Sequence, residues 1–442
     1  MSVEIKPISN AVKWTICCVA AIGFLFDIYE ILVAPLVVQP ALLELGGFRL
    51  GTAEYRFWAG LFLWIPPLIG GFCGLWGGYF TDRLGRRRIL VWSILLYTVS
   101  AVAAGLATSV TALLIFRTLC YTGVCVEFVA AVAWLAELFP DPKTREAVLG
   151  YTQIFSSMGG LLVSGIFFLA SRYGASFPAI NGSHAAWRYT LIGGVLPAIP
   201  LMIIRPFLPE SPEWAAKKAA GTLKRPSVGE LFHPQFRRAT IITTLMFACA
   251  YGAAIGTIQQ GPQIAGGMPE VASLPPAERG QATSSASGAQ EFGGLAGRLT
   301  MATLAMIIVS RRSLLRLFLV PGLIIMPIVF LYSSGQGLQW FRIGMFMAGF
   351  TTVAQLNFLG SYLPRVFPVY LRGTGEGFAA NVGGRMMGSS FSFIVTHLAG
   401  VMPGATPGLQ LAYAAGTIGI CVYATALVAT WWLPEPPAKL ED

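Results

Sequence analysis

The stretch Gly77–Leu90, GGYFTDRLGRRRIL, places one carboxylate and four arginines between two long apolar runs. Gly77 and Gly78 allow another helix to approach closely, and Gly85 permits a tight reversal of the chain. The arginine cluster predicts that this reversal lies on the cytoplasmic side of a membrane. The stretch therefore predicts two membrane-spanning helices joined by a short charged turn.

The composition of the whole chain agrees with this interpretation. Of 442 residues, 55% are apolar and 11% are charged, which leaves too little polar surface for a soluble protein of this size. About twelve apolar stretches of roughly 18 to 25 residues could cross a hydrocarbon core about 30 Å thick as helices. We expect an all-α membrane protein with spans at 14–38, 58–80, 88–107, 110–138, 148–171, 188–208, 239–265, 289–310, 315–333, 339–364, 376–398 and 409–433.

The longest cytoplasmic connection stands between the sixth and seventh spans. It divides the chain into an N-terminal six-helix bundle at 1–208, a linker with interfacial helices at 209–238, and a C-terminal six-helix bundle at 239–442. The net charge of +10 could suggest a nucleic-acid partner, but most lysines and arginines fall in alternate loops. That distribution is typical of the cytoplasmic side of a membrane protein. We therefore expect a multi-pass protein of the inner membrane, with both termini cytoplasmic and no nucleic-acid partner.

The sequence predicts local structure in two of the segments that connect the spans. In the linker, Ser211 before Pro212 is a typical helix start, and Ser227 followed by Glu230 is a second one. We expect short helices there at the inner membrane surface, with Trp214 dipping toward the lipid headgroups. The segment at about 266–288 is rich in Pro, Ala and Ser and is expected to be an external, mobile loop.

The charged turn has the pattern G-x-x-x-D-R-x-G-R-R-R, which resembles the cytoplasmic loop signature of the major facilitator superfamily. The stretch RTLCYTGVCVEF resembles the fourth span of this superfamily, and LPESPEW resembles its sugar-porter and organic-ion branches. The stretch YLPRVFPVYLRGTGEGFAANVGGR resembles the metabolite:proton and aromatic-acid:proton symporters. The resemblance implies two six-helix bundles, a monomer, and a latch of the outward-facing state built from Gly78, Asp82, Arg83, Gly85, Arg86 and Arg87.

The corresponding turn of the second half departs from this pattern. Its sequence VSRRSLLR, Val309–Arg316, keeps the positive charge but has neither the acidic residue nor the glycine. The two latches are therefore expected to be unequal. If a carboxylate holds the second turn, we expect it to come from Glu210 or Glu213.

Ionisable side chains inside the spans indicate function, because each costs about 2.5 to 3.5 kcal/mol near the bilayer centre. Asp27 and Glu30 share one helical face. Two neighbouring carboxylates disfavour double ionisation, which suits one of them to carry a proton. Glu127 is a further proton or substrate candidate, and Arg117 resembles the fourth-span arginine that the superfamily links to proton coupling. Each of these groups could instead belong to a structural ion pair.

The second half supplies the candidates for substrate binding. An arginine fork matches a carboxylate, which makes Arg385 the first choice and Arg298 the second. A permanent salt bridge of Arg385 with Asp27, Glu127 or Glu291 is the alternative. The seventh span carries amides that resemble the paired glutamines of sugar porters. These amides are Gln259, Gln260 and Gln263. The remaining candidates are Tyr29, beside Asp27 and Glu30, and the polar residues Gln153 and Asn357, which could equally be contacts between helices.

These features predict a proton-coupled secondary transporter that works by alternating access, and its expected partners are protons, a small solute and the lipid bilayer. Organic acids, including aromatic carboxylates, are the favoured substrates because two arginines lie in the second half. A sugar or polyol, an organic cation, and a non-transporting membrane sensor remain alternatives. No nucleotide-binding loop, metal-ligand spacing or nucleophile–base pair is present in the sequence, so we expect no enzyme, no cofactor and no metal.

Overall fold

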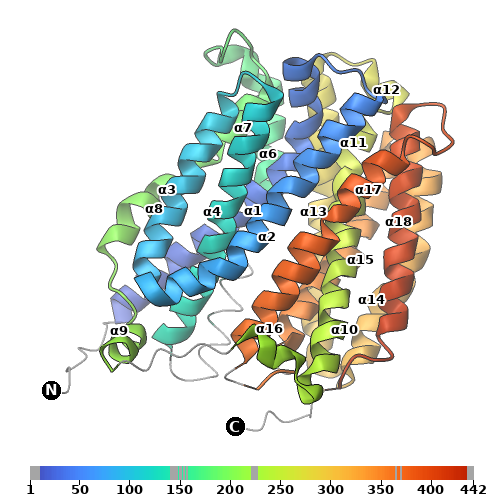
Figure 1. Cartoon of the computed structure of the whole chain (residues 1–442). Helices are drawn as coiled ribbons and strands as arrows, with labels where there is room; N and C mark the ends of the chain where they lie inside the picture. Colours follow the sequence, from blue (N-terminus) through green and yellow to red (C-terminus); the bar gives the residue numbers. More distant parts are fainter. Residues whose placement is uncertain are drawn as a thin grey trace.

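The computed structural model describes residues 10–139, 148, 152, 155, 158–220, 227–363, 366–368 and 371–435. Within these ranges the first half of the chain is helical, and it lies beside the second half (Figure 1). The long helices of the first half are α1 (Asn10–Gly46), α2 (Ala53–Leu84), α3 (Arg86–Gly105), α4 (Val110–Leu138), α6 (Met158–Tyr173), α7 (Ala186–Gly193) and α8 (Val195–Ile204). A short turn, η2 (Arg205–Phe207), follows α8.

Several spans of the second half are built from consecutive helical segments that include π-helical turns. The seventh span comprises α10 (Pro234–Tyr251), η4 (Gly252–Thr257), η5 (Ile258–Gln260) and α11 (Gly261–Gly266). The next three spans are α13 (Pro276–Ile307), α14 (Arg311–Pro327) with η6 (Ile328–Tyr332), and α15 (Leu338–Tyr362). The last two are α16 (Arg372–Phe378) with η9 (Ala379–Gly388) and α17 (Ser390–Leu398), and then α18 (Pro407–Ala429).

Ten helices in the described ranges are long and apolar enough to cross a membrane. Two further spans expected from the sequence, 289–310 and 376–398, are occupied by α13 and by the run from α16 to α17. These two helical runs carry more small and polar residues than the others, as expected for helices that face protein rather than lipid. The arrangement confirms the twelve-helix fold.

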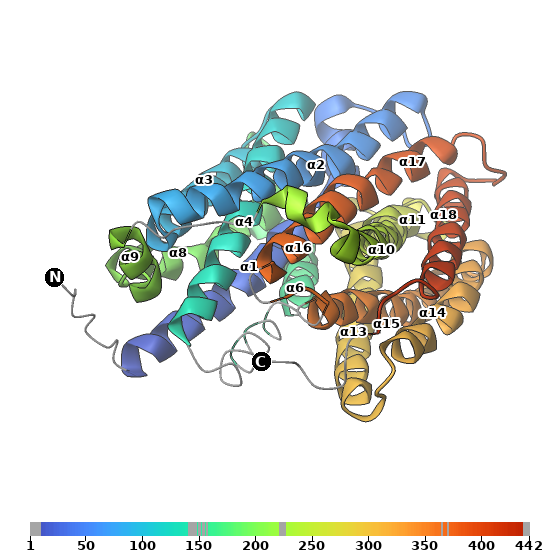
Figure 2. The same cartoon turned by 60° about the horizontal axis from the view of Figure 1, so that its bottom comes forward.

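Each half buries its own apolar side chains. One cluster of buried residues extends from Ile16 to Leu208, and the other extends from Leu231 to Leu433. Figure 2 shows the two groups of helices on either side of a central region, with α6 beside α13 and α2 beside α17. The central region is therefore lined by both halves. The domain limits at 208 and 239 stay predictions.

The linker confirms both predicted helix starts. The Ser211 hydroxyl accepts a hydrogen bond from the Trp214 backbone N–H and caps α9 (Pro212–Ala219). Ser227 and Glu230 form a capping box on η3 (Val228–Phe232). The expectation for Trp214 is wrong: its side chain is buried, with the Lys218 ammonium over its ring and its edge against Gly85. The indole packs on the turn between α2 and α3 because that glycine leaves room for it.

The expectation of a long external loop at 266–288 is also wrong. This segment contains α12 (Pro269–Ala272), and from Pro276 onward it is already α13. Ala, Ser and Gly indicate a loop in water, but they let helices pack closely inside a membrane protein. Ser287 shows this packing, because it receives a hydrogen bond of 3.0 Å from Ser164 of α6 in the other half.

Candidate functional site

Asp27 lies on α1, facing the central region. Its side chain is 2% exposed, and neither carboxylate oxygen has a hydrogen-bond partner among the described residues. Glu30, Glu127, Arg205 and Arg385 are the charged groups that act on it electrostatically. A buried, unpartnered carboxylate is costly when ionised. Among the described acids of α1 and α4, Asp27 is the one that forms no ion pair.

Two buried ion pairs flank Asp27 along the face of α1. Three residues after Asp27, Glu30 receives a hydrogen bond of 2.7 Å from Arg117 of α4. Four residues before it, Gly23 lies against the ion pair of Glu127 with Arg205, whose atoms are 2.5 Å apart. Each acid of these pairs is neutralised by an arginine of the same half. The first half therefore leaves Asp27 alone with an uncompensated charge if it ionises.

Arg385 comes from the π-helical segment η9 and reaches the first half. It is 7% exposed, donates a hydrogen bond of 2.7 Å to Asn381 and lies over the Phe128 ring, 5.8 Å from the centroid. No carboxylate of the described residues forms an ion pair with it. The permanent salt bridge considered from the sequence is therefore not formed with Asp27, Glu127 or Glu291. Because its contacts are a side-chain amide and an aromatic ring, the Arg385 guanidinium can still donate hydrogen bonds to an anion.

The predicted glutamines lie close together in the second half. Gln263 accepts a hydrogen bond of 2.9 Å from Tyr55 of α2, and its own amide donates to the Gln260 carbonyl oxygen at 2.9 Å. The Gln259 amide donates to Glu291 of α13 at 3.5 Å, and the adjacent Gln290 amide donates to the same oxygen at 3.0 Å. The amides thus form two hydrogen-bonded groups, one of Gln260 and Gln263 with Tyr55 and one of Gln259 and Gln290 with Glu291.

The other residues predicted from the sequence have contacts or surroundings of their own. The Tyr29 hydroxyl donates to the Thr190 carbonyl oxygen at 2.6 Å, so it is already bonded within the first half. Arg298 lies on α13, two turns beyond Glu291, and interacts with it electrostatically. Asn357 is half-buried on α15, and Gln153 lies outside the described residues. The roles expected for these residues stay predictions.

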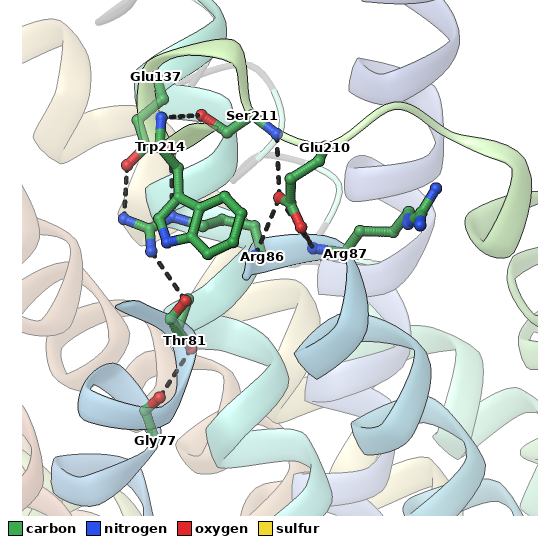
Figure 3. Close-up of polar contacts among 8 residues, drawn as sticks. All are labelled: Gly77, Thr81, Arg86, Arg87, Glu137, Glu210, Ser211 and Trp214. Atoms are coloured by element: carbon green, nitrogen blue, oxygen red, sulfur yellow. Dashed lines mark hydrogen bonds and ion pairs between the residues drawn. The ribbon is translucent and has the colours of Figure 1, made fainter. Parts of the chain in front are cut away.

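The charged turn between α2 and α3 is held by a carboxylate from the linker (Figure 3). Gly85 adopts a φ of +103°, a conformation that favours glycine. Glu210 accepts hydrogen bonds from the Arg86 backbone N–H at 3.0 Å and from the Arg87 backbone N–H at 3.2 Å. This carboxylate therefore satisfies free N–H groups at the start of α3. A Cβ at position 85 would collide with it.

The side chains of this turn lie in different surroundings. The Arg86 guanidinium donates to both carboxylate oxygens of Glu137, at 2.6 and 3.1 Å, and to the Thr81 carbonyl oxygen (Figure 3). Arg83 is exposed and contacts Tyr79, whereas Gly78 is buried within α2. The side chain of Asp82 lies outside the described part of the chain. The latch expected for this turn stays a prediction.

The second half has an equivalent cap at the start of α14. Glu435, which follows α18, accepts hydrogen bonds from the Arg311 and Arg312 backbone N–H groups, both at 3.0 Å, and from the Ser310 hydroxyl at 2.9 Å. The expectation that Glu210 or Glu213 supplies this carboxylate is wrong. Glu210 is already bonded to the first half, and the segment after the last helix lies nearer to α14.

Comparison with known proteins supports the same architecture. A family model described as "Sugar (and other) transporter" matches residues 16–231. The chain is 28% identical over 382 residues to the probable 4-methylmuconolactone transporter of Cupriavidus pinatubonensis, covering 84% of this chain and 79% of that protein. It is 24% identical to the 3-(3-hydroxy-phenyl)propionate transporter of Escherichia coli, covering 76% and 78%. A crystal structure of a D-xylose–proton symporter superposes with a TM-score of 0.75 at 18% identity, covering 97% of this chain and 99% of that one.

The chain has the fold of the major facilitator superfamily and is similar in sequence to its transporters. The described helices support a multi-pass membrane protein, and these relatives are named as transporters of small metabolites rather than as enzymes.

Sequence reasoning missed several polar residues of the protein. Arg205 precedes Pro206 at the end of a span, so it counts as one of the loop cations, yet its side chain is buried against Glu127. The sequence suggests Glu291 only as a possible partner for Arg385, and it does not single out Gln290. Both occur in a segment rich in small residues, where a charged side chain is expected to have a partner or a function. The charge of Glu291 within this segment could therefore have marked it as a site residue, but the sequence does not show which residues contact it.

Proposed function

We propose that this protein is a proton-coupled symporter of small organic carboxylates. The observation that carries the proposal is Arg385: it is buried at the contact between the halves, and no described carboxylate pairs with it. A buried arginine favours an anionic partner, and its planar fork matches the two oxygens of a carboxylate. A substrate carboxylate would supply that partner.

Asp27 supplies the coupling. When it is ionised, its negative charge partly compensates Arg385, since the two groups act on one another electrostatically. Protonation of Asp27 removes this compensation and increases the affinity of Arg385 for an anion. Proton and substrate therefore bind together, and the loaded central region carries less net charge than a region with either one alone. The loaded state is then the one in which the halves can close around the substrate.

Two further observations bear on the substrate class. The names of two of the relatives describe transporters of a muconolactone and of a hydroxyphenyl propionate, which supports an organic acid. Glu30 and Glu127 are both paired with arginines, so these two acids do not offer their charge to an organic cation. The glutamines of η5 and α11 favour hydroxyl groups, so a neutral sugar or polyol is the second candidate.

Direct transport by the purified protein tests the proposal. Proteoliposomes with an alkaline interior would be offered labelled benzoate, D-xylose or tetraethylammonium. Because benzoic acid itself crosses a bilayer toward an alkaline interior, we expect benzoate alone to accumulate faster in protein-containing than in protein-free liposomes, and we expect this excess to be lost when a protonophore collapses the pH gradient. Accumulation of xylose without benzoate would favour the second candidate, and benzoate uptake that ignores the protonophore would contradict proton coupling.

The orientation in the membrane belongs to the same proposal. The α2–α3 turn and α9 lie at one end of the molecule, and α7 and α12 lie toward the other (Figure 1). The arginines of this turn support a cytoplasmic location for that end of an inner-membrane monomer, with both termini on the same side. A cysteine introduced at exposed Lys218 is then expected to react with an impermeant maleimide in inverted vesicles but not in intact cells.

A further inference from the structure

Glu291 is a carboxylate of the second half that reaches the first half. It projects from α13 to Gly160 of α6, where an added Cβ would collide with its carboxylate group. The two helices lie side by side (Figure 2). Arg385 reaches the first half at a different place, beside Gly74 of α2 and the Phe128 ring. The second half therefore presents an acid and a cation to the contact between the halves from two different helices.

The groups around Glu291 can bind a hydroxyl group. One of its carboxylate oxygens accepts hydrogen bonds from the side-chain amides of Gln259 and Gln290. The Gln290 carbonyl oxygen and the Gln260 amide nitrogen have no partner among the described residues, although both side chains are 0% exposed. These atoms are an unused acceptor and an unused donor, and an ionised carboxylate also has several acceptor positions. A hydroxyl group both donates and accepts, so it matches this set.

The negative charge of Glu291 disfavours a ligand that carries a second carboxylate at this position. Glu291 would repel a carboxylate placed beside it, with its charge partly offset by Arg298 two turns along α13, whereas Arg385 would attract a carboxylate. A ligand with one carboxylate and one or more hydroxyl groups offers a chemically suitable partner to each of the two positions. A dicarboxylate of the same length satisfies only one.

We propose that Glu291, with Gln290 and Gln260, selects hydroxylated monocarboxylates, and that it binds the substrate hydroxyl group while Arg385 binds the carboxylate. The inference rests on the proposed carboxylate symport. It unites the amides that favour sugars and the arginine that favours acids in one substrate class, a hydroxy acid.

Competition with matched acids tests the inference in proteoliposomes. Uptake of labelled 3-hydroxybenzoate would be competed with unlabelled benzoate or 3-hydroxybenzoate, and separately with hexanoate, gluconate or adipate. In the wild type we expect each hydroxylated monocarboxylate to compete about tenfold better than its plain counterpart, the discrimination of one hydrogen bond to a charged group. Adipate should compete no better than hexanoate.

Variants separate this inference from the proposed function. Glu291→Gln should reduce the preference to about twofold or less, because a neutral amide bonds a hydroxyl group more weakly than a carboxylate does. Glu278→Gln, on the exposed outer turn of the same helix, should keep the wild-type preference. Ligand-induced thermal shifts of the purified variants give a second readout that does not depend on transport rate, and Glu291→Asp serves if Glu291→Gln fails to fold.

The outcomes are distinguishable. If plain and hydroxylated acids compete equally in the wild type, or if the preference survives Glu291→Gln, the inference is overturned while carboxylate transport stands. If no acid is transported or competes at all, the proposed function fails first.

Discussion

In the first half, the buried charges meet as ion pairs, Glu30 with Arg117 and Glu127 with Arg205, whereas in the second half Arg385 rests on an amide and an aromatic ring. The first half is thus nearly neutral by itself, apart from Asp27. The second half presents a charge that its own described acids do not pair. In the proposed function, the first half adjusts the charge of the central region by one proton, and the second half supplies the binding groups.

Breaking an ion pair of the first half should have the largest effect, and the effect should be on stability. Glu127→Gln leaves the buried Arg205 without its counter-charge, which should destabilise the protein by about 3 to 5 kcal/mol. Thermal unfolding in detergent measures the change. The double variant Glu127→Leu with Arg205→Met removes both charges and should recover most of the loss. A Glu127→Gln protein as stable as wild type would show that the pair is not what neutralises this part of the first half.

The corresponding change in the second half should affect transport instead. Arg385→Gln should lower carboxylate uptake about 100-fold, because charge-assisted hydrogen bonds to the substrate contribute roughly 1.5 to 3 kcal/mol. Its unfolding temperature should be equal to that of wild type or higher, since an uncompensated buried charge is removed. A strong loss of stability would instead mean that Arg385 has a structural partner.

Substitution of Asp27 should impair proton-driven uptake while leaving substrate exchange intact. Asp27→Asn fixes the group in a neutral form, so uptake driven by a pH gradient should fall at least about tenfold while substrate counterflow stays within about twofold of wild type. Both are measured in the same proteoliposomes. Gradient-driven uptake at the wild-type rate would remove Asp27 from the proton pathway.

The smallest effect concerns the cap on α14. Burial alone would raise the pKa of Glu435, but hydrogen bonds from the Arg312 backbone, the Ser310 hydroxyl and the Arg311 backbone outweigh it and lower that pKa. The stabilisation is therefore fully present above the pKa of an unfolded glutamate, about 4.3, and is lost as the pH falls through the lower folded value.

Glu435→Gln tests this cap. The side chain of Glu435 is 35% exposed, and solvent screens it, so the variant should lose only about 0.5 to 1 kcal/mol at pH 7. Unfolding measured between pH 7 and pH 3 should show the variant and wild type converging at the acid end. A constant difference over that range would assign the effect to packing rather than to charge.

The sequence predicted most of the fold because long apolar spans and local helix starts, such as Ser211 and Ser227, depend on nearby residues. It could not predict contacts that depend on packing between distant segments. Trp214 looks like a membrane-surface residue until Gly85 is placed beside it, and Arg205 looks like a loop cation until Glu127 approaches. The candidate site depends on both kinds of information. Asp27 and Arg385 stand out as charges in apolar spans, but which buried charges remain without a partner depends on the tertiary structure.

The two caps also have a consequence for biogenesis. Glu210 follows α8, so the start of α3 can be capped while the ribosome is still producing the linker and before α10 exists. Glu435 follows α18, so the start of α14 must wait until the final helix has been inserted. Each carboxylate lies 124 residues after the backbone N–H group that it caps, so both halves wait for their cap over the same length of synthesis. Until that point each half is an incomplete assembly in the membrane, on which insertion chaperones and quality-control proteases can act.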